Sequence, residues 1–521
     1  MIRPIAALIA LTALATPLGA APVPKEAQAP KPLSEAVVKA WEKAGATVGR
    51  VNPDAVQIKF LPKTLTGNSS RSSELPVLVV GKYRDRMFAE LPAPDVPFVL
   101  DLSACHVPED GFADLTRFEQ LRALRVGPSG EEPWLGPALA RLYQLRSLTF
   151  RFSVLSGDLL KGVGQLKGLR VLNLGANART LTDAGLKRLV GLHQLHTLSL
   201  EGAPITDAGV QELAALKSLR VLNLNGTRVS NAGLKHLAAL EHLETLALGG
   251  TGVTGAGLRE LRPLTVLTTL FLCGVPLDDA AARELAGFRN LRELDLTLTR
   301  LTDEGLAEVA RLPRLAALVL DKTGVTDTGV KALGGALALE KLSLFATSVT
   351  GETLGALVAC KGLRALDLNH SLITDAGAER IATLKTLTHL SFCRSEVTDR
   401  GVKALAALTN LEELVLSEIA VTDTGIRHLA ALRSLQKLTL ESTKMTDAGL
   451  RELAALKQLK SLSVCGTAVT GAGITEFRKK VSGCHVTAGI IVVPLPSVDA
   501  PVLSPLLDVP LPPPPAARPG E

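Results

Sequence analysis

The stretch VTDTGVKAL, residues 325–333, pairs a threonine with an aspartate, and near copies of it recur along most of the chain. LTDAGLKRL begins at Leu181 and VTDTGIRHL begins at Val421. The apolar residue ahead of the Thr-Asp pair returns every 24 residues from Leu181 to Val469, without an insertion. Weaker copies upstream, between residues 107 and 155, bring the total to about sixteen units. A repeat period in the twenties predicts a solenoid, in which each unit stacks on the next.

A single unit, Leu216–Leu240, shows why the units must stack. Its segment LRVLNL alternates, so that Leu222 and Leu224 face one way, which is typical of a half-buried strand. The following AGLKHLAAL puts apolar side chains on one face of a helix. Neither face can be buried within one unit, so stacked units bury both in a continuous core. Because strands pack more closely than helices, we predict a curved α/β horseshoe with a parallel concave sheet and convex helices.

The repeated Thr-Asp pair could be a ladder of metal ligands, or it could mark element boundaries in the fold. The thirteen regular units carry Thr, Ser230 or Asp278 at the first position of the pair. At the second position they carry Asp, Asn231, or glycine in three units: Gly255, Gly351 and Gly471. A metal-binding or catalytic carboxylate could not be replaced by glycine. All these residue types are favoured at helix N-caps, so the pair predicts the start of each helix, without deciding which residue is the cap.

The pattern LxxLxLxxTxVTDAGLxxLAxL resembles the leucine-rich repeats of the ribonuclease-inhibitor-like superfamily, most closely a bacterial 24-residue type built on Thr-Asp-x-Gly-Leu. The resemblance covers about residues 98–487 and implies a non-enzymatic scaffold that binds a protein on its concave face. The chain is also similar to the cysteine-containing repeats of F-box proteins, which implies a less favoured role as a substrate-recognition module. It departs from that type because threonine mostly replaces the Cys or Asn of the family's ladder, and no F-box-like segment precedes the repeats.

The N-terminal part differs from the repeats. Residues 1–20 have a positive start, an apolar run and small residues near Ala20, which is the layout of a secretory signal peptide. The apolar run is shorter than the ~20 residues of a membrane-spanning helix, and an uncleaved anchor is the alternative. We therefore expect a periplasmic, cell-surface or extracellular protein. Residues 21–97 predict a linker and capping region. Within LSEAVVKAWEKAGATVG we expect a short helix with Ser34 as a possible N-cap and a stop at Gly45, and strands are expected at AVQIKF and LPVLVVG.

The C-terminal residues 488–521 are rich in proline. Proline lacks a backbone N–H and favours the polyproline II conformation. This composition predicts a disordered tail or a spacer across a cell wall. The alternative is that these residues bind a proline-recognising domain.

The net charge of +6 and the pI of about 9.0 raise the possibility of a nucleic-acid partner. The positions expected to line the concave face carry more acids than bases, so the excess positive charge lies elsewhere. Nucleic acid in the groove would need a basic stripe, and we expect none. The acids are Asp101, Glu201, Glu293, Asp295, Asp321, Asp367, Glu413, Glu418 and Glu441, and the bases are Arg125, Arg151, Lys322, Lys341, Arg394 and Lys437.

Few residues suggest a metal, a cofactor or a disulfide. Cys273, Cys393 and Cys465 fall in one column of the repeat, but they are several units apart. At ~4.8 Å per strand, even three units exceed the ~7 Å Cα separation that a disulfide allows, so free thiols are expected. The segment HQLH at residues 193–196 resembles a metal pair, but no Cys or carboxylate cluster completes it. We expect no cofactor, no metal site and no small-molecule substrate.

Two clusters on the concave face are the candidate protein-binding site. Large apolar side chains, expected to be exposed and set among polar ones, resemble the centre of a binding hot spot, although neighbouring aromatics covering one another would explain them equally well. The first cluster holds Phe271, Asp295, Val319, Asp321, Lys341 and Phe345. The second holds Asp367, Asn369, His370, His389 and Arg394, together with Cys393.

We expect an exported, non-enzymatic protein-binding scaffold, whose partner the sequence does not name. A structural or adhesive element of the cell envelope is the alternative. An enzyme that uses His370 and Cys393 as a nucleophilic pair is the least favoured hypothesis. His389 and Cys393 are four residues apart on one strand, roughly 13 Å, and cannot touch.

Overall fold

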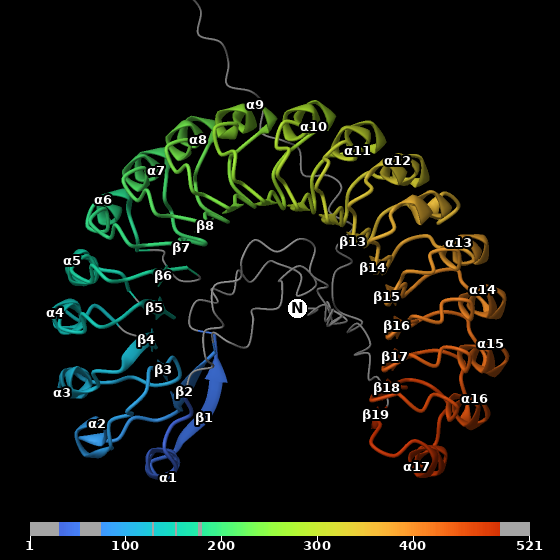
Figure 1. Ribbon diagram of the computed structural model, residues 1–521, viewed down its shortest axis with the longest axis horizontal. Helices are drawn as coiled ribbons and strands as arrows, with labels where there is room; N and C mark the ends of the chain where they lie inside the picture. Colours follow the sequence, from blue (N-terminus) through green and yellow to red (C-terminus); the bar gives the residue numbers. More distant parts are fainter. Residues whose placement is uncertain (1–30, 53–73, 128–129, 152–153, 176–179, 490–521) are drawn as a thin grey trace, which may run out of the picture.

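The computed structural model describes five segments of the chain: residues 31–52, 74–127, 130–151, 154–175 and 180–489. They form an open horseshoe with one sheet along the inner side and helices along the outer side (Figure 1). The predicted α/β solenoid is confirmed. The expected signal peptide, the strand expected at AVQIKF and residues 490–521 of the proline-rich tail lie outside the described residues.

One sheet of 19 strands runs through the described part of the chain. β1 pairs antiparallel with β2, and from β2 onward each strand pairs parallel with the next. The repeat strands are in register, so Leu270 lies between Leu246 and Leu294. The strands are β1 (Ala46–Val51), β2 (Leu75–Val80), β3 (Phe98–Leu102), β4 (Leu121–Val126), β5 (Ser147–Phe150), β6 (Val171–Asn173), β7 (Thr197–Ser199), β8 (Val221–Asn223), β9 (Thr245–Ala247), β10 (Thr269–Phe271), β11 (Glu293–Asp295), β12 (Ala317–Val319), β13 (Lys341–Ser343), β14 (Ala365–Asp367), β15 (His389–Ser391), β16 (Glu413–Val415), β17 (Lys437–Thr439), β18 (Ser461–Ser463) and β19 (His485–Thr487).

Short helices cover the convex side, and the leucines between helix and sheet form one continuous core. The α-helices are α1 (Glu35–Lys43), α2 (Met87–Glu90), α3 (Glu109–Asp114), α4 (Leu135–Ala140), α5 (Gly157–Val163), α6 (Asp183–Leu186), α7 (Asp207–Leu213), α8 (Asn231–Leu237), α9 (Gly255–Leu258), α10 (Asp279–Leu285), α11 (Asp303–Val309), α12 (Asp327–Ala332), α13 (Asp375–Ile381), α14 (Asp399–Leu405), α15 (Asp423–Leu429), α16 (Asp447–Leu453) and α17 (Gly471–Lys480). The 3-10 helices are η2 (Leu115–Arg117), η3 (Arg259–Leu261), η4 (Leu333–Gly335) and η5 (Leu354–Ala359).

The N-terminal helix α1 follows Ser34 and stops just before Gly45, as the sequence predicts. It ends at Lys43, because Gly45 adopts a φ of +89°, and the chain then returns as β1 beside β2. The Trp41 ring is fully buried, with its centroid 6.1 Å from that of Phe88 and 5.8 Å from that of Phe118. These aromatic rings cover the N-terminal end of the leucine core.

The first residue of the Thr-Asp pair caps the helix that follows. The hydroxyl of Thr470 accepts the backbone N–H of Gly473 at 3.1 Å. Asp278, which stands in the threonine position, accepts the N–H of Ala281 at 3.1 Å. Such bonds satisfy N–H groups that the first helical turn leaves without partners. The capping prediction is confirmed in nine regular units, where the cap is the residue in the threonine position. Thr182, Thr254 and Thr302 precede their helices without such a bond.

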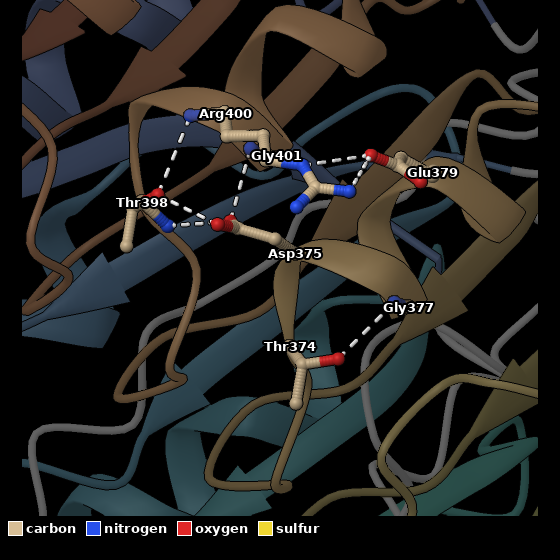
Figure 2. A network of polar contacts seen from close by, with 7 residues as sticks. All are labelled: Thr374, Asp375, Gly377, Glu379, Thr398, Arg400 and Gly401. Atoms are coloured by element: carbon tan, nitrogen blue, oxygen red, sulfur yellow. Dashed lines mark hydrogen bonds and ion pairs between the residues drawn. The ribbon is translucent and has the colours of Figure 1, made fainter.

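The aspartate of the pair instead joins each unit to the next one. Asp375 is the first residue of α13, and its Oδ1 accepts the backbone N–H of Thr398 in the following unit at 2.8 Å (Figure 2). Its Oδ2 accepts the Thr398 hydroxyl at 2.7 Å, and Oδ1 also accepts the N–H of Gly401 at 2.9 Å. The same two-bond link from Asp to Thr or Ser recurs in Asp183–Thr206, Asp207–Ser230, Asp279–Thr302, Asp303–Thr326, Asp327–Thr350, Asp399–Thr422, Asp423–Thr446 and Asp447–Thr470.

The glycine of Thr-Asp-x-Gly leaves space for the carboxylate of the preceding unit. A Cβ added to Gly401 would lie 2.6 Å from the Oδ1 of Asp375, closer than any real contact allows. Where Gly255 replaces the aspartate, the glycine 26 residues later is replaced by Ala281. A Cβ on Gly255 would lie 2.4 Å from the Cβ of Ala281. In both of these pairs one position lacks a side chain where the other carries one.

Candidate functional site

The concave face buries two of the three large apolar side chains that the sequence placed there. Phe271 is 3% exposed and Val319 is 1% exposed, so the expectation that they are exposed is wrong. Neither belongs to the leucine core, and Phe271 lies in register between Ala247 and Asp295 on the neighbouring strands. Strands stand ~4.8 Å apart, and on the concave side of a bent sheet the side chains converge. Their direction was predicted correctly, but their exposure was not.

Three aspartates lie near the carboxyl ends of the central strands. Asp295 accepts the N–H of Thr297 at 2.8 Å, and Asp367 accepts the N–H of Asn369 at 2.9 Å, which closes the turn after each strand. Burial raises the pKa of Asp367 to about 7, and the negative charge of Asp321 adds to the effect. Burial also raises the pKa of Asp321 to about 6, although Ser343 and the Phe345 N–H donate hydrogen bonds to it.

The other charged residues of the floor are partly paired. Lys437 contacts Glu413 at 2.6 Å, across β17 and β16. Burial raises the pKa of Glu293, while the nearby Lys341 opposes this shift. The floor of the horseshoe therefore combines buried carboxylates with a small number of lysines, and it has no continuous basic stripe of the kind that nucleic acid requires.

Phe345 differs from Phe271 because it is only half-buried and lies between two exposed side chains. The ammonium nitrogen of Lys322 lies 6.0 Å from the centroid of its ring. On the other side, the His370 ring centroid lies 4.9 Å away, with an angle of 51° between the rings. Farther along, Arg394 forms an ion pair with Glu418 at 2.6 Å. The predicted residues Lys322, Phe345 and His370 are thus brought together, whereas Arg394 has a partner of its own.

A row of seven left-handed residues, which we call the rim row, follows the carboxyl edge of the sheet. They come from seven successive units of the chain, and each has a φ of +52° to +58°. The equivalent position is glycine in other units, for example Gly226, Gly250 and Gly274. A side chain in this conformation costs about 1–2 kcal/mol, which glycine avoids. The rim row is Leu298, Lys322, Ala346, His370, Arg394, Glu418 and Ser442.

Backbone hydrogen bonds hold the rim row in place. The N–H of Leu298 donates to the carbonyl of Asp321, and the N–H of His370 donates to that of Cys393, both at 2.9 Å. These links impose the left-handed turn on whichever residue occupies the position. Leu298 is 53% exposed, and Leu372, two residues past His370, is 52% exposed. Neither leucine was predicted as a site residue, although the glycines in the column of Leu298 were visible in the sequence.

The geometry around Cys393 is unsuited to nucleophilic chemistry. The thiol is buried, and burial raises its pKa, whereas a nucleophilic cysteine needs a lowered pKa. Burial lowers the pKa of His389 to about 4, and its Nδ1 lies 2.8 Å from the hydroxyl of Thr388. Asn369 is also buried, where its side-chain oxygen accepts the N–H of Cys393 at 2.7 Å. Asn369 therefore supports the turn rather than offering a free polar group to a partner.

Two features are absent from the described residues. Among them, no helix is long and apolar enough to cross a membrane, and no group of three or more His, Cys, Asp or Glu side chains could hold a metal ion. All six cysteines lie in this part of the chain and are free.

Comparison with known proteins identifies the repeat. The model of a leucine-rich-repeat region matches residues 78–354, just over half of the chain, and a second leucine-rich-repeat model matches residues 359–382. No curated protein matches the chain. An internalin (InlF) of Listeria monocytogenes is similar in structure, with 22% identity, a TM-score of 0.47, and coverage of 58% of this chain and 82% of the internalin.

Two further solved structures share the repeat architecture. A leucine-rich-repeat protein of Leptospira interrogans has 22% identity and a TM-score of 0.45, with coverage of 78% of this chain and 93% of that protein. A plant peptide hormone receptor, RGFR1, in complex with RGF2, has 14% identity and a TM-score of 0.38, with coverage of 80% and 81%. At these identities the likeness concerns the fold. The family is shown by the match of the repeat model over more than half of the sequence: the chain belongs to the leucine-rich-repeat proteins.

Proposed function

We propose that this protein is an exported, non-enzymatic scaffold that binds another protein through the concave face of its repeats. Leucine-rich-repeat proteins are typically binding scaffolds without catalytic activity, and the fold itself suggests an interaction role. The observation that carries the proposal is the cluster of Phe345, Lys322 and His370 at the concave edge, which the leucine core does not need. Aromatic and cationic side chains of this kind are enriched at binding hot spots.

The charge of the concave face supports a protein rather than a nucleic-acid partner. Its floor carries the buried Asp295 and the half-buried Asp321 and Asp367, whose carboxylates would repel phosphates when ionised. The raised pKa of the Cys393 thiol supports a binding role rather than an enzymatic one. Export follows from the signal-peptide layout of residues 1–20 and is part of the proposal.

Site-specific photo-cross-linking in the native cell envelope tests the proposal. A photoreactive residue is placed at Thr269, on the concave strand β10, and in a matched variant at Arg283, on the exposed face of α10 in the same unit. We expect the Thr269 variant to form a discrete protein adduct and the Arg283 variant to form none. Adducts from Arg283 alone, or from neither position, would contradict a concave binding face.

A further inference from the structure

The rim row carries side chains in a conformation that the fold fills with glycine elsewhere. In four units before it and one after it, the same position is Gly202, Gly226, Gly250, Gly274 or Gly466, with φ between +63° and +72°. The backbone is therefore compatible with glycine throughout. Seven consecutive units nevertheless carry a side chain there. Strained residues that persist where an unstrained one would serve are concentrated at functional sites.

Part of this row coincides with an exposed apolar and cationic surface, which we call the rim patch. It comprises Leu298, Lys322, Phe345, His370 and Leu372. Six large apolar side chains are exposed in the described part of the chain, and two of them, Leu298 and Leu372, stand at the two ends of this patch. Lys322 lies between them; among the described residues it forms no ion pair, and its ammonium nitrogen lies 6.0 Å from the centroid of the Phe345 ring. Its charge also acts on the neighbouring, half-buried Asp321. The patch thus offers two apolar ends and one exposed cation.

The spacing of these groups limits what can bind. Leu298, Lys322 and His370 belong to units that span three strand intervals, or about 14 Å at ~4.8 Å per strand. An extended chain rises ~3.3 Å per residue, so a segment of about five residues covers the same length. A carboxylate near the middle of that segment would reach Lys322, and apolar side chains at its ends would cover the two leucines.

We propose that the rim patch is the docking site for an extended acidic segment of a partner protein, with apolar side chains flanking an Asp or Glu. The inference rests on the proposed function and narrows it to one edge of the concave face. The charge of Lys322 selects the carboxylate, and the Phe345 ring, which lies at 51° to the His370 ring, contacts that cation. The left-handed backbone places Lys322 and His370 at the edge of the sheet.

The test uses a phage-displayed library of random dodecapeptides, selected on the full-length protein. We expect enriched peptides to carry an Asp or Glu between apolar residues. The decisive variant combines Leu298→Gly, Lys322→Gly and His370→Gly, which removes the side chains and relieves the strained conformation. Its melting temperature should be unchanged or higher, while its affinity for the enriched peptides should fall at least tenfold. A Ser442→Gly variant, in the same row but three units beyond His370, should bind as the wild type does.

A floor variant separates the failure of this inference from the failure of the proposed function. Thr269→Arg places a bulky charge on the concave strand β10, away from the rim patch. If the peptides bind the glycine variant normally but lose affinity for Thr269→Arg, the rim inference is overturned and concave binding stands. If enriched peptides lack acidic residues, the proposed chemistry is overturned. If no peptide is enriched, or if neither variant affects binding, both proposals fall.

Discussion

The link between units can be tested at Asp399 and Gly425. The Oδ1 of Asp399 accepts the N–H of Thr422 at 2.8 Å, and its Oδ2 accepts the Thr422 hydroxyl at 2.6 Å. A hydrogen bond to a charged group contributes about 1.5–3 kcal/mol, and partial exposure reduces this. We expect Asp399→Gly to lower the free energy of unfolding by about 2–4 kcal/mol, more than the 0.5–2 kcal/mol typical of a lost helix cap.

Gly425→Ala probes the same contact from the other side. Its Cβ would lie 2.5 Å from the Oδ1 of Asp399 and 3.0 Å from its Cα, so the carboxylate must move away. Overpacking of this kind costs about 1–3 kcal/mol, and the lost hydrogen bonds add to it. Gly471→Ala is the matched control, because nothing lies within 4 Å of a Cβ there and alanine is the better helix former. The control should be neutral or stabilising.

The double variant Asp399→Gly with Gly425→Ala recreates the natural combination of Gly255 and Ala281. It should be more stable than the sum of the single changes predicts, by about 1–3 kcal/mol, because the alanine enters the space that the carboxylate vacates. Urea unfolding followed by far-ultraviolet circular dichroism measures all variants. Additive effects in the double variant would refute the exchange of space between the two positions.

Three further predictions concern a raised pKa, the burial of two phenylalanines and export. Asp367→Asn should stabilise the protein by about 2–4 kcal/mol at pH 8 and have no effect below pH 4, as measured by urea unfolding across pH. The pKa of Asp367 in the folded state, about 7, lies above the usual value of 3.8. The native state therefore retains a proton, and the stability of the wild type falls as the pH rises from about 4 to 7. Phe271→Ala should lower the melting temperature more than Phe345→Ala does, because Phe271 is 3% exposed while Phe345 is half-buried; equal shifts would contradict this. N-terminal sequencing of exported protein should begin at Ala21, and an intact Met1 would favour a membrane anchor.

The fold could be predicted because each unit repeats the same two periodicities, and a strand and a helix with one apolar face each can be buried only by stacking. The capping role of the Thr-Asp pair was also accessible, because the residue types alone indicate it. The link that the aspartate forms to the next unit could not be predicted. The hydrogen-bond partner of Asp375 lies 23 residues away in the next unit, and cap chemistry uses the same residue types.

One unit departs from the Thr-Asp-x-Gly pattern in a way that only the structure explains. Thr353 occupies the glycine position of its unit, and there the convex element is the 3-10 helix η5 instead of an α-helix. Asp327 of the preceding unit accepts the N–H of Thr353 at 3.3 Å and that of Gly351 at 3.1 Å. The Thr353 side chain fills the space that glycine leaves in other units, so the Asp327 carboxylate binds a backbone that is shifted.

The sequence predicted which face of the sheet the side chains of the candidate site occupy, but it did not predict how exposed they are. Alternation along a strand tells which face a side chain takes, so Phe271 and Val319 were placed on the concave side. Whether the curved sheet covers them depends on neighbours in other units, which alternation does not describe. Leu298 was not predicted, although Lys322 and His370 of the same column were, because its exposure depends on the left-handed turn three residues beyond β11, which alternation does not describe.

Hydrogen–deuterium exchange of the full chain, with and without the cross-linked partner, tests concave binding most directly. Partner binding should slow exchange in the segments that contain the strand ends and the rim, residues 296–300, 320–324 and 368–372. Exchange in the convex helices of the same units, α11 to α13, should be unchanged. Protection confined to the helices, with none in the strand-end segments, would contradict a concave binding face.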